Sequence, residues 1–280
     1  MFKLLRDVLT QEVAADGFEY RAGTDAFGPT GVAFLDEGRW LVANGATDEL
    51  YLLERLGVSA GVPIAPEAGL MDLCFDLDGR LYGTRWGFKD IVEVEPETGT
   101  VLRVVRDGFE GPAAIVLDPV AGELLVSDFS AHRVVAIDPG SGDQTVRADA
   151  DTIRHPDGIA VASDGRLFVA CPWDLRVVCV ERDGTVREVA QVDGKPDGIA
   201  LARDDAPLRG SIVVSLRNGD LATINTAGQL TVIATDGTPA DLLTVDRDGY
   251  LYVTQIDQVV RIGPGMFQPT SGSSWPMTLG

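Results

Sequence analysis

The chain has 280 residues, of which 45% are apolar, and it carries a formal net charge of −20. A surface this acidic repels nucleic-acid phosphates and anionic lipids, so we expect neither as a partner. No window approaches 18 continuous apolar residues, and the first 17 residues carry charges that a signal peptide would lack, so neither a membrane span nor secretion is expected. The three cysteines form no CxxC motif, which favours reduced thiols and a cytoplasmic location.

One sequence pattern recurs six times along the chain. Its copies lie roughly 40 to 44 residues apart, and a period in this range is typical of propellers and solenoids. The copies begin at Gly28, Gly69, Gly111, Arg154, Lys195 and Thr238. The fourth copy reads RHPDGIAVASDGRLFVACPW, with an apolar run on either side of an Asp-Gly turn.

Each copy predicts four short strands. An apolar run leads to a tight turn, which three of the copies build as Asp78-Gly79, Asp164-Gly165 and Asp248-Gly249. Asp-Gly between two strand-forming runs is a strong hairpin signal, because glycine accepts a positive φ. A polar loop and two further runs complete the unit, and four strands per unit describe one blade of a propeller. The sequence therefore predicts an all-β fold, a six-bladed β-propeller with four strands per blade.

The last copy contains only three of its four expected strands. These three strands are predicted at 242–246, 250–254 and 258–262. The run near residues 18–22 resembles the fourth strands of the other copies, so we expect this N-terminal strand to complete the last blade and close the ring. The predicted organisation is an N-terminal extension over 1–17 with the periodicity of a short helix, a single propeller over 18–265, and a C-terminal tail over 266–280.

The residue that opens the first strand of each copy occupies one position of the ring, at the mouth of the central channel. In chain order these residues are Thr30, Met71, Ala113, Asp157, Asp197 and Asp241. Three carboxylates around one mouth need a counter-charge, which is either a bound cation or a proton on a carboxyl with a raised pKa. Either state suits catalysis, so the three aspartates are candidate catalytic residues. The alternative is that each aspartate only shapes the turn that starts its strand.

The loops that follow the second strands face the same mouth. They carry the candidate substrate-binding residues Asn44, Arg85, Trp86, Phe129, His132, Trp173, Arg217 and Gln255. Aromatic walls with a few polar groups are typical of sites for small organic molecules. The alternative is a packed lid between blades.

Both histidines of the chain, His132 and His155, fall on this face. A histidine paired with Asp157 or with Asp128 would serve as a general base, which makes His155 a further candidate catalytic residue. The alternative for each histidine is a structural role, and for His132 the structural role is favoured.

Two stretches resemble a known family. The pattern HPDGIAV followed by DGRLFVA, and VSDFSAHRVVAID at residues 126–138, are similar to NHL repeats and to the SMP-30/gluconolactonase/LRE-like six-bladed propellers, and the resemblance covers about residues 18–265. In that family, a divalent cation is held by a glutamate on the first blade, two asparagines on the next two, and the aspartate of a Pro-Asp-Gly.

Only Asp157 of this chain matches that cation-binding set. Thr30, Met71 and Ala113 stand where the glutamate and the asparagines would be, so the comparison implies a diverged metal site. If the chain binds a divalent cation such as Ca²⁺, Mg²⁺ or Zn²⁺, we expect its ligands to be the three aspartates. The resemblance implies hydrolysis of a lactone or ester. Two alternatives stay open: a metal-free cyclase or condensing enzyme resembling strictosidine synthase-like propellers, and a non-catalytic binding module of the NHL type.

Overall fold

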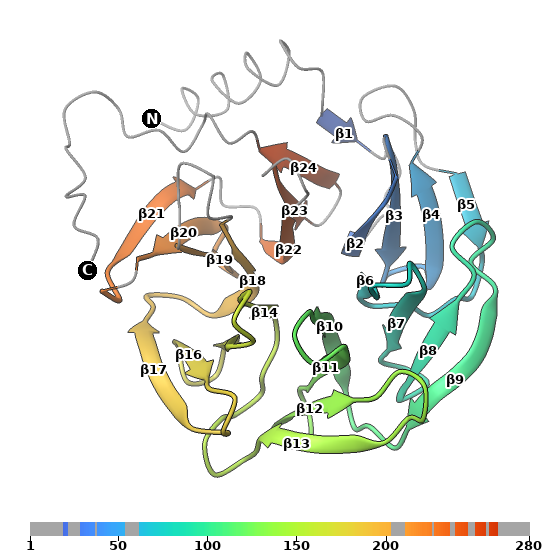
Figure 1. Cartoon of the computed structure of the whole chain (residues 1–280). Helices are drawn as coiled ribbons and strands as arrows, with labels where there is room; N and C mark the ends of the chain where they lie inside the picture. The colour runs from blue at the N-terminus through green and yellow to red at the C-terminus, as the bar shows by residue number, and fades with distance from the viewer. Residues whose placement is uncertain are drawn as a thin grey trace.

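We analysed a computed structural model of the chain, shown in Figure 1. It describes residues 19–21, 29–36, 38–53, 62–202, 211–225, 227–235, 239–245, 250–255 and 258–262. Within these ranges the secondary structure consists of 24 strands and no helix, so none of the described residues forms a helix able to span a membrane. The strands form four-stranded antiparallel sheets around a central axis, which confirms the predicted all-β propeller.

The strand pairing gives six such sheets, here called blades one to six in chain order. Blade one contains β2 (Pro29–Asp36), β3 (Arg39–Asn44), β4 (Glu49–Leu53) and β5 (Val62–Ala65). Blade two contains β6 (Leu73–Phe75), β7 (Leu81–Arg85), β8 (Asp90–Val94) and β9 (Val101–Asp107). Blade three contains β10 (Pro112–Asp118), β11 (Glu123–Asp128), β12 (Arg133–Ile137) and β13 (Gln144–Ala148).

The second half of the ring repeats this order. Blade four contains β14 (Ile159–Val161), β15 (Leu167–Cys171), β16 (Arg176–Val180) and β17 (Val186–Gln191). Blade five contains β18 (Pro196–Leu201), β19 (Ile212–Leu216), β20 (Asp220–Ile224) and β21 (Leu230–Thr235). Blade six contains β22 (Ala240–Val245), β23 (Leu251–Gln255), β24 (Gln258–Ile262) and the N-terminal β1 (Glu19–Arg21).

The N-terminal strand β1 closes the ring. It pairs antiparallel with β24, and Tyr20 lies opposite Val259. Blade six is therefore built from both ends of the described chain, as the sequence predicts, and this pairing covers an edge that would otherwise be open. The predicted extension over 1–17 and the predicted tail over 266–280 lie outside the described residues.

The hairpin turns follow the local chemistry of Asp-Gly. Gly79 and Gly165 adopt φ values of 80° and 83°, which an L-residue with a side chain seldom adopts. Each glycine N–H also closes its turn, donating to the carbonyl of Asp76 or Ala162. The third predicted turn, Asp248-Gly249, lies outside the described residues.

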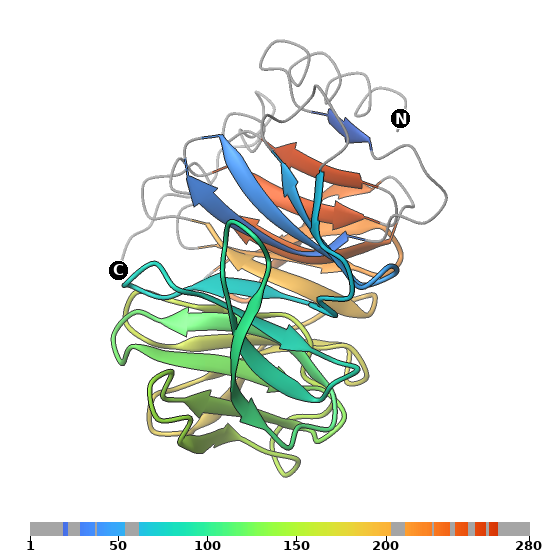
Figure 2. The ribbon, with the colours of Figure 1, turned by 90° about the vertical axis from the view of Figure 1, so that its right-hand side faces the viewer.

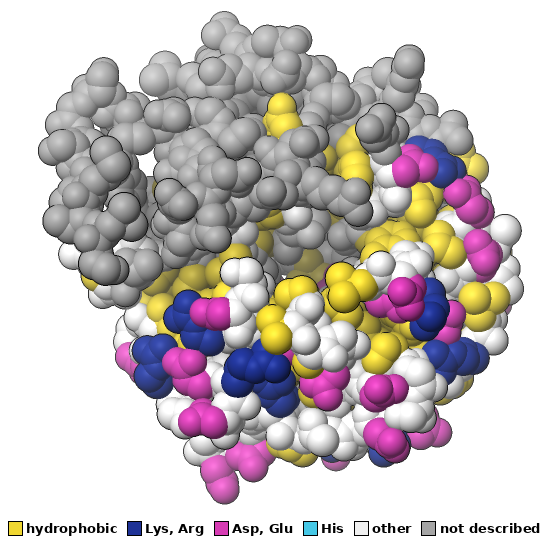
Figure 3. All heavy atoms as spheres, in the orientation of Figure 1, with side chains coloured by type: hydrophobic (Ala, Val, Ile, Leu, Met, Phe, Trp, Pro, Cys, Tyr) yellow, Lys and Arg dark blue, Asp and Glu magenta, His cyan; other side chains and the backbone are white. Residues whose placement is uncertain are grey.

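The hydrophobic core lies between neighbouring blades. Leu125 of β11 packs with Leu167 and Val178 of blade four, and comparable apolar clusters join the other blades. The sheets twist from their inner to their outer strands, as the side view shows (Figure 2). On the face shown in Figure 3, acidic and basic side chains are intermixed along the rim and apolar side chains gather toward the centre. The interblade core fixes the inner strands, and the inner strands position the candidate site.

Candidate functional site

The three predicted aspartates lie at adjacent positions of the inner ring. The N–H of Gly158 donates a 3.0 Å hydrogen bond to the Asp197 carbonyl, so the backbones beside Asp157 and Asp197 touch directly. A Cβ atom added to Gly198 would lie 2.3 Å from the Asp241 carbonyl oxygen, which shows equally close packing toward blade six. The glycine of each Pro-Asp-Gly is thus required where neighbouring inner strands meet, and the aspartate before it is held next to the neighbouring inner strand.

A single guanidinium bridges two of these carboxylates. Arg217, directly after β19, donates from Nε to Asp197 Oδ2 at 2.7 Å and from Nη2 to Asp157 Oδ2 at 3.2 Å. The two aspartate side chains are 12% and 6% exposed, for Asp157 and Asp197, whereas the arginine side chain is 53% exposed. Arg217 therefore covers a buried carboxylate pair from the solvent side.

Burial shifts the ionisation of this group. The pKa of Asp157 is raised well above its ordinary value, mainly by burial. The Asp197 and Asp241 carboxylates raise it further. The pKa of Asp241 is raised to about 7, mainly by burial and secondly by the neighbouring Asp197 carboxylate. Arg217 opposes both shifts. One oxygen of Asp197, Oδ1, is buried without a hydrogen-bond partner among the described residues.

The residues present do not fit the divalent cation that the resemblance implies. At the equivalent positions of blades one to three, Thr30 directs its hydroxyl to the Ala43 carbonyl, while Met71 and Ala113 offer no oxygen ligand in their side chains. No group of three or more histidine, cysteine, aspartate or glutamate side chains in the described ranges is arranged to hold a metal ion. The charge that faces Asp157 and Asp197 is instead the guanidinium of Arg217.

Four ring systems from blades two, three and four form a row that we call the aromatic shelf: Trp86, Phe129, His155 and Trp173. Adjacent ring centroids lie 5.8 Å, 4.7 Å and 5.3 Å apart in that order. The two tryptophans at its ends are 38% and 58% exposed. An exposed aromatic row suits the apolar part of a small ligand.

Lys195 joins the shelf to the aspartates. Its ammonium lies 4.0 Å from the centroid of the Trp173 ring, and its carbonyl accepts a 2.9 Å hydrogen bond from the N–H of Arg217. Sequence reasoning missed this residue, although a signal exists: Lys195 precedes Pro-Asp-Gly in blade five as His155 does in blade four. Equivalent positions of two neighbouring blades thus flank Trp173.

The two histidines contact each other rather than an aspartate. The backbone N–H of His155 donates to Nδ1 of His132 at 3.1 Å, and the ring centroids are 4.0 Å apart. Nδ1 of His132 is therefore the hydrogen-bond acceptor in this contact. Burial, and then His132, lowers the pKa of His155. Both residues adopt the left-handed backbone region, with φ of 54° and 46°. Asp48, Lys89 and Leu175 do the same at the position of His132 in other blades, so for His132 this conformation belongs to the repeated turn.

The described residues do not form the predicted histidine–aspartate pair. No hydrogen bond joins either imidazole to Asp157 or Asp128 in the described structure. Asp128 accepts instead from the N–H groups of Glu110 and Gly111 and from Arg133. Its carboxylate is fully buried, and these donors already satisfy its hydrogen bonding without an imidazole.

Three other predicted substrate-binding residues are engaged in local structure. The Asn44 side-chain oxygen accepts from the N–H groups of Ala46 and Thr47, which is a turn-stabilising role. Arg85 forms a 2.6 Å ion pair with Asp90 and stacks over the ring of Phe88. Gln255 is buried at the end of β23, opposite Gln258 of β24.

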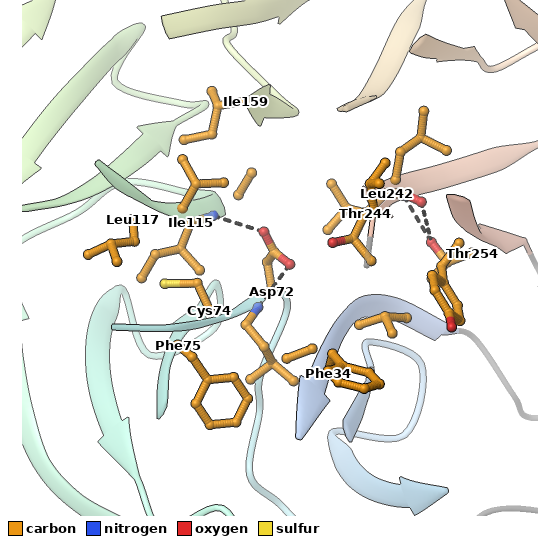
Figure 4. Close-up of a pocket in the computed structure, with 18 of the residues that line it drawn as sticks. Phe34, Asp72, Cys74, Phe75, Ile115, Leu117, Ile159, Leu242, Thr244 and Thr254 are labelled. Atoms are coloured by element: carbon orange, nitrogen blue, oxygen red, sulfur yellow. Dashed lines mark hydrogen bonds between the residues drawn. The ribbon is translucent and has the colours of Figure 1, made fainter. Parts of the chain in front are cut away.

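A cavity of about 300 Å³ lies between the inner strands. Figure 4 shows side chains that line it. Its wall is mostly apolar and includes Phe34, Phe75 and Ile159. Asp72 points into it, and its two oxygens accept from the N–H groups of Leu73 and Ile115 at 2.8 and 2.9 Å. Burial raises the pKa of Asp72 to about 7. The sequence feature that could have identified Asp72 as a buried acid is its place inside the apolar run LMDLCF.

Comparison with known proteins places this fold in a family. Residues 8–205 match the SMP-30/Gluconolactonase/LRE-like region. The chain belongs to the SMP-30/gluconolactonase/LRE-like family. No curated protein matches it in sequence.

Several solved structures share the fold of this family member. A gluconolactonase from Xanthomonas campestris is 21% identical, with a TM-score of 0.69, over 84% of this chain and 85% of that chain. A catalytically inactive virginiamycin B lyase from Staphylococcus aureus with quinupristin is 16% identical, with a TM-score of 0.65, over 88% and 87%. A chain of the nidogen/laminin complex is 17% identical, with a TM-score of 0.63, over 82% and 84%. The fold therefore serves both enzymes and binding proteins, and function depends on the site.

Proposed function

We propose that this protein is an enzyme of the lactone- or ester-hydrolase type that acts on a small organic molecule at the channel mouth. The observation that carries the proposal is the buried Asp157–Asp197 pair bridged by Arg217. Lys195 connects this pair to the aromatic shelf, because its carbonyl accepts from the N–H of Arg217 and its ammonium lies over the ring of Trp173. Membership of the SMP-30/gluconolactonase/LRE-like family supports the same reaction class.

The two carboxyl groups have the different environments that acid–base catalysis requires. Asp197 has the shorter contact with Arg217, and it is the group that accepts a proton from the attacking water. Burial and the neighbouring carboxylates raise the pKa of Asp157, which favours its protonated form, and we assign to it the proton that goes to the departing alkoxide oxygen. Water adds to the carbonyl carbon, the C–O bond breaks, and an acid and an alcohol result.

Arg217 has donors to spare for the transition state. A guanidinium carries five N–H groups, and two of those in Arg217 donate to the aspartates. Its exposed half can donate to the carbonyl oxygen as negative charge develops there, which is the kind of stabilisation that contributes most in acyl transfer. The aromatic shelf would hold the apolar remainder of the substrate.

A second candidate is a cyclase or condensing reaction that does not consume water. It is favoured by the loss of oxygen ligands at Thr30, Met71 and Ala113, because the site then lacks the ligand set for a water-activating cation. The same acid–base pair would move a proton between two positions of one substrate.

The test measures turnover of a panel of lactones and aryl esters by the wild type and by the Asp157→Asn and Asp197→Asn variants. We expect kcat to fall by a factor of about 10² to 10⁴ in each variant. Asp164→Asn, at an exposed turn of blade four, is the control and should keep full activity. Incorporation of ¹⁸O from labelled water separates hydrolysis from a cyclase. Both variants retaining activity would refute the assignment, and binding without turnover by the wild type would favour the NHL-type module.

A further inference from the structure

We propose that Arg217 takes the place of a divalent cation in this site, so that its guanidinium is the permanent counter-charge of the Asp157–Asp197 pair. The inference concerns the same residues as the proposed function. It predicts a binding property, however, that can be measured without any substrate.

The need for a counter-charge follows from burial. The Asp157 and Asp197 side chains are 12% and 6% exposed, and Asp241 lies at the next position of the ring. Carboxylates removed from water and placed side by side destabilise the fold unless a positive group faces them. Of the described residues, only Arg217 forms ion pairs with this group.

The geometry is that of a bridge between two carboxylates. Nε and Nη2 lie on one edge of the planar guanidinium, and each donates to a different aspartate, at 2.7 and 3.2 Å. A lysine ammonium would supply the charge, but it lacks the rigid fork that spans two acceptors. The contact resembles the way one metal ion joins two carboxylates, with directional N–H donors in place of coordination bonds.

The rest of the ring agrees with this replacement. The equivalent positions of the first three blades hold Thr30, Met71 and Ala113, which provide no oxygen cage. Both hydrogen bonds of Arg217 go to Oδ2 atoms, and Oδ1 of Asp197 is buried without a hydrogen-bond partner among the described residues. Without the guanidinium, the carboxylates and this free oxygen would be available to a hydrated cation.

The experiment compares the metal responses of the wild type, Arg217→Gln and Arg217→Lys after treatment with EDTA. Thermal unfolding and isothermal titration with Mn²⁺ and with Ca²⁺ are the readouts. We expect no response from the wild type and an increase of about 3 °C in the Tm of Arg217→Gln at millimolar cation. Arg217→Lys keeps the charge and should stay unresponsive. Asp197→Asn added to Arg217→Gln should abolish the response, because it removes a ligand.

Arg133→Gln provides the matched control. Arg133 also pairs with a buried aspartate, Asp128, but that carboxylate has no acidic neighbour bridged by the same arginine. This variant should lose stability without gaining a cation response. The control separates a specific site from a general effect of removing an arginine.

Two results would overturn the inference: wild-type protein that binds Mn²⁺ or Ca²⁺ with an EDTA-reversible rise in Tm, or folded Arg217→Gln protein without any response. If Arg217→Gln does not fold, the wild-type titration still decides the question. Failure of the proposed function is distinguishable, because catalysis can be absent while the cation response of Arg217→Gln is present.

Discussion

Replacing Gly158 by alanine tests how the inner ring is held together. The new Cβ would lie 2.3 Å from the Asp197 carbonyl oxygen and 2.9 Å from both Gly198 Cα and Ile199 N. All three atoms belong to the backbone of the neighbouring inner strand, so no side chain can rotate away. Overpacking of this kind costs about 1–3 kcal/mol. The 3.0 Å hydrogen bond from Gly158 to Asp197 would also be disturbed, at a cost of about 1 kcal/mol.

The sum is a loss of about 2–4 kcal/mol in the free energy of unfolding. For a propeller of this size it corresponds to a fall in Tm of roughly 5–10 °C. Thermal and urea unfolding followed by circular dichroism measure the change. Gly87→Ala is the control, because its Cβ would meet nothing within 4 Å, and it should unfold with the wild type. A Gly158→Ala variant within 1 °C of the wild type would refute the close interblade packing on which the aspartate positions depend.

Two further predictions concern the channel and the shelf. Burial raises the pKa of Asp72 to about 7, so the stability that its bound proton contributes is complete below pH 4 and is lost as the pH rises through 7. Asp72→Asn cannot titrate, and its Tm deficit relative to the wild type should shrink between pH 5 and pH 8; a constant deficit would contradict a buried neutral carboxyl. Trp173→Ala removes an exposed ring of the shelf, so KM should rise about tenfold with kcat and Tm nearly unchanged. Val120→Ala, another exposed apolar residue, should leave KM unaltered, and equal KM values in both variants would remove the shelf from the binding site.

The arrangement of the aspartates also explains why Pro-Asp-Gly recurs in blades four and five. Its glycine allows the next inner strand to approach, and its aspartate is then placed beside the aspartate of the neighbouring blade. The same motif thus serves the packing of the ring and places the carboxyl groups for which we propose a catalytic role. In blade one, Gly31 packs equally closely against the backbone of Met71 and Asp72, but the residue before it is Thr30 and not an aspartate.

The repeat made the propeller predictable from sequence. Asp-Gly turns and alternating runs act over a few residues, so each copy specifies its own hairpins without reference to distant parts of the chain. Equivalent positions in equivalent blades must fall at equivalent places in the ring. For that reason the level of Asp157, Asp197 and Asp241 could be predicted, as could the closing strand near residues 18–22.

The partners of those residues depended on tertiary structure. Arg217 is 60 residues from Asp157 in the chain, and only the ring brings its guanidinium to that carboxylate. The contact between the two histidines likewise depends on the packing of blade three against blade four, which brings the backbone N–H of His155 to Nδ1 of His132. Local sequence determines which residues reach the channel mouth. The packing of one blade against the next decides which of them share a charge, a proton or a ring contact.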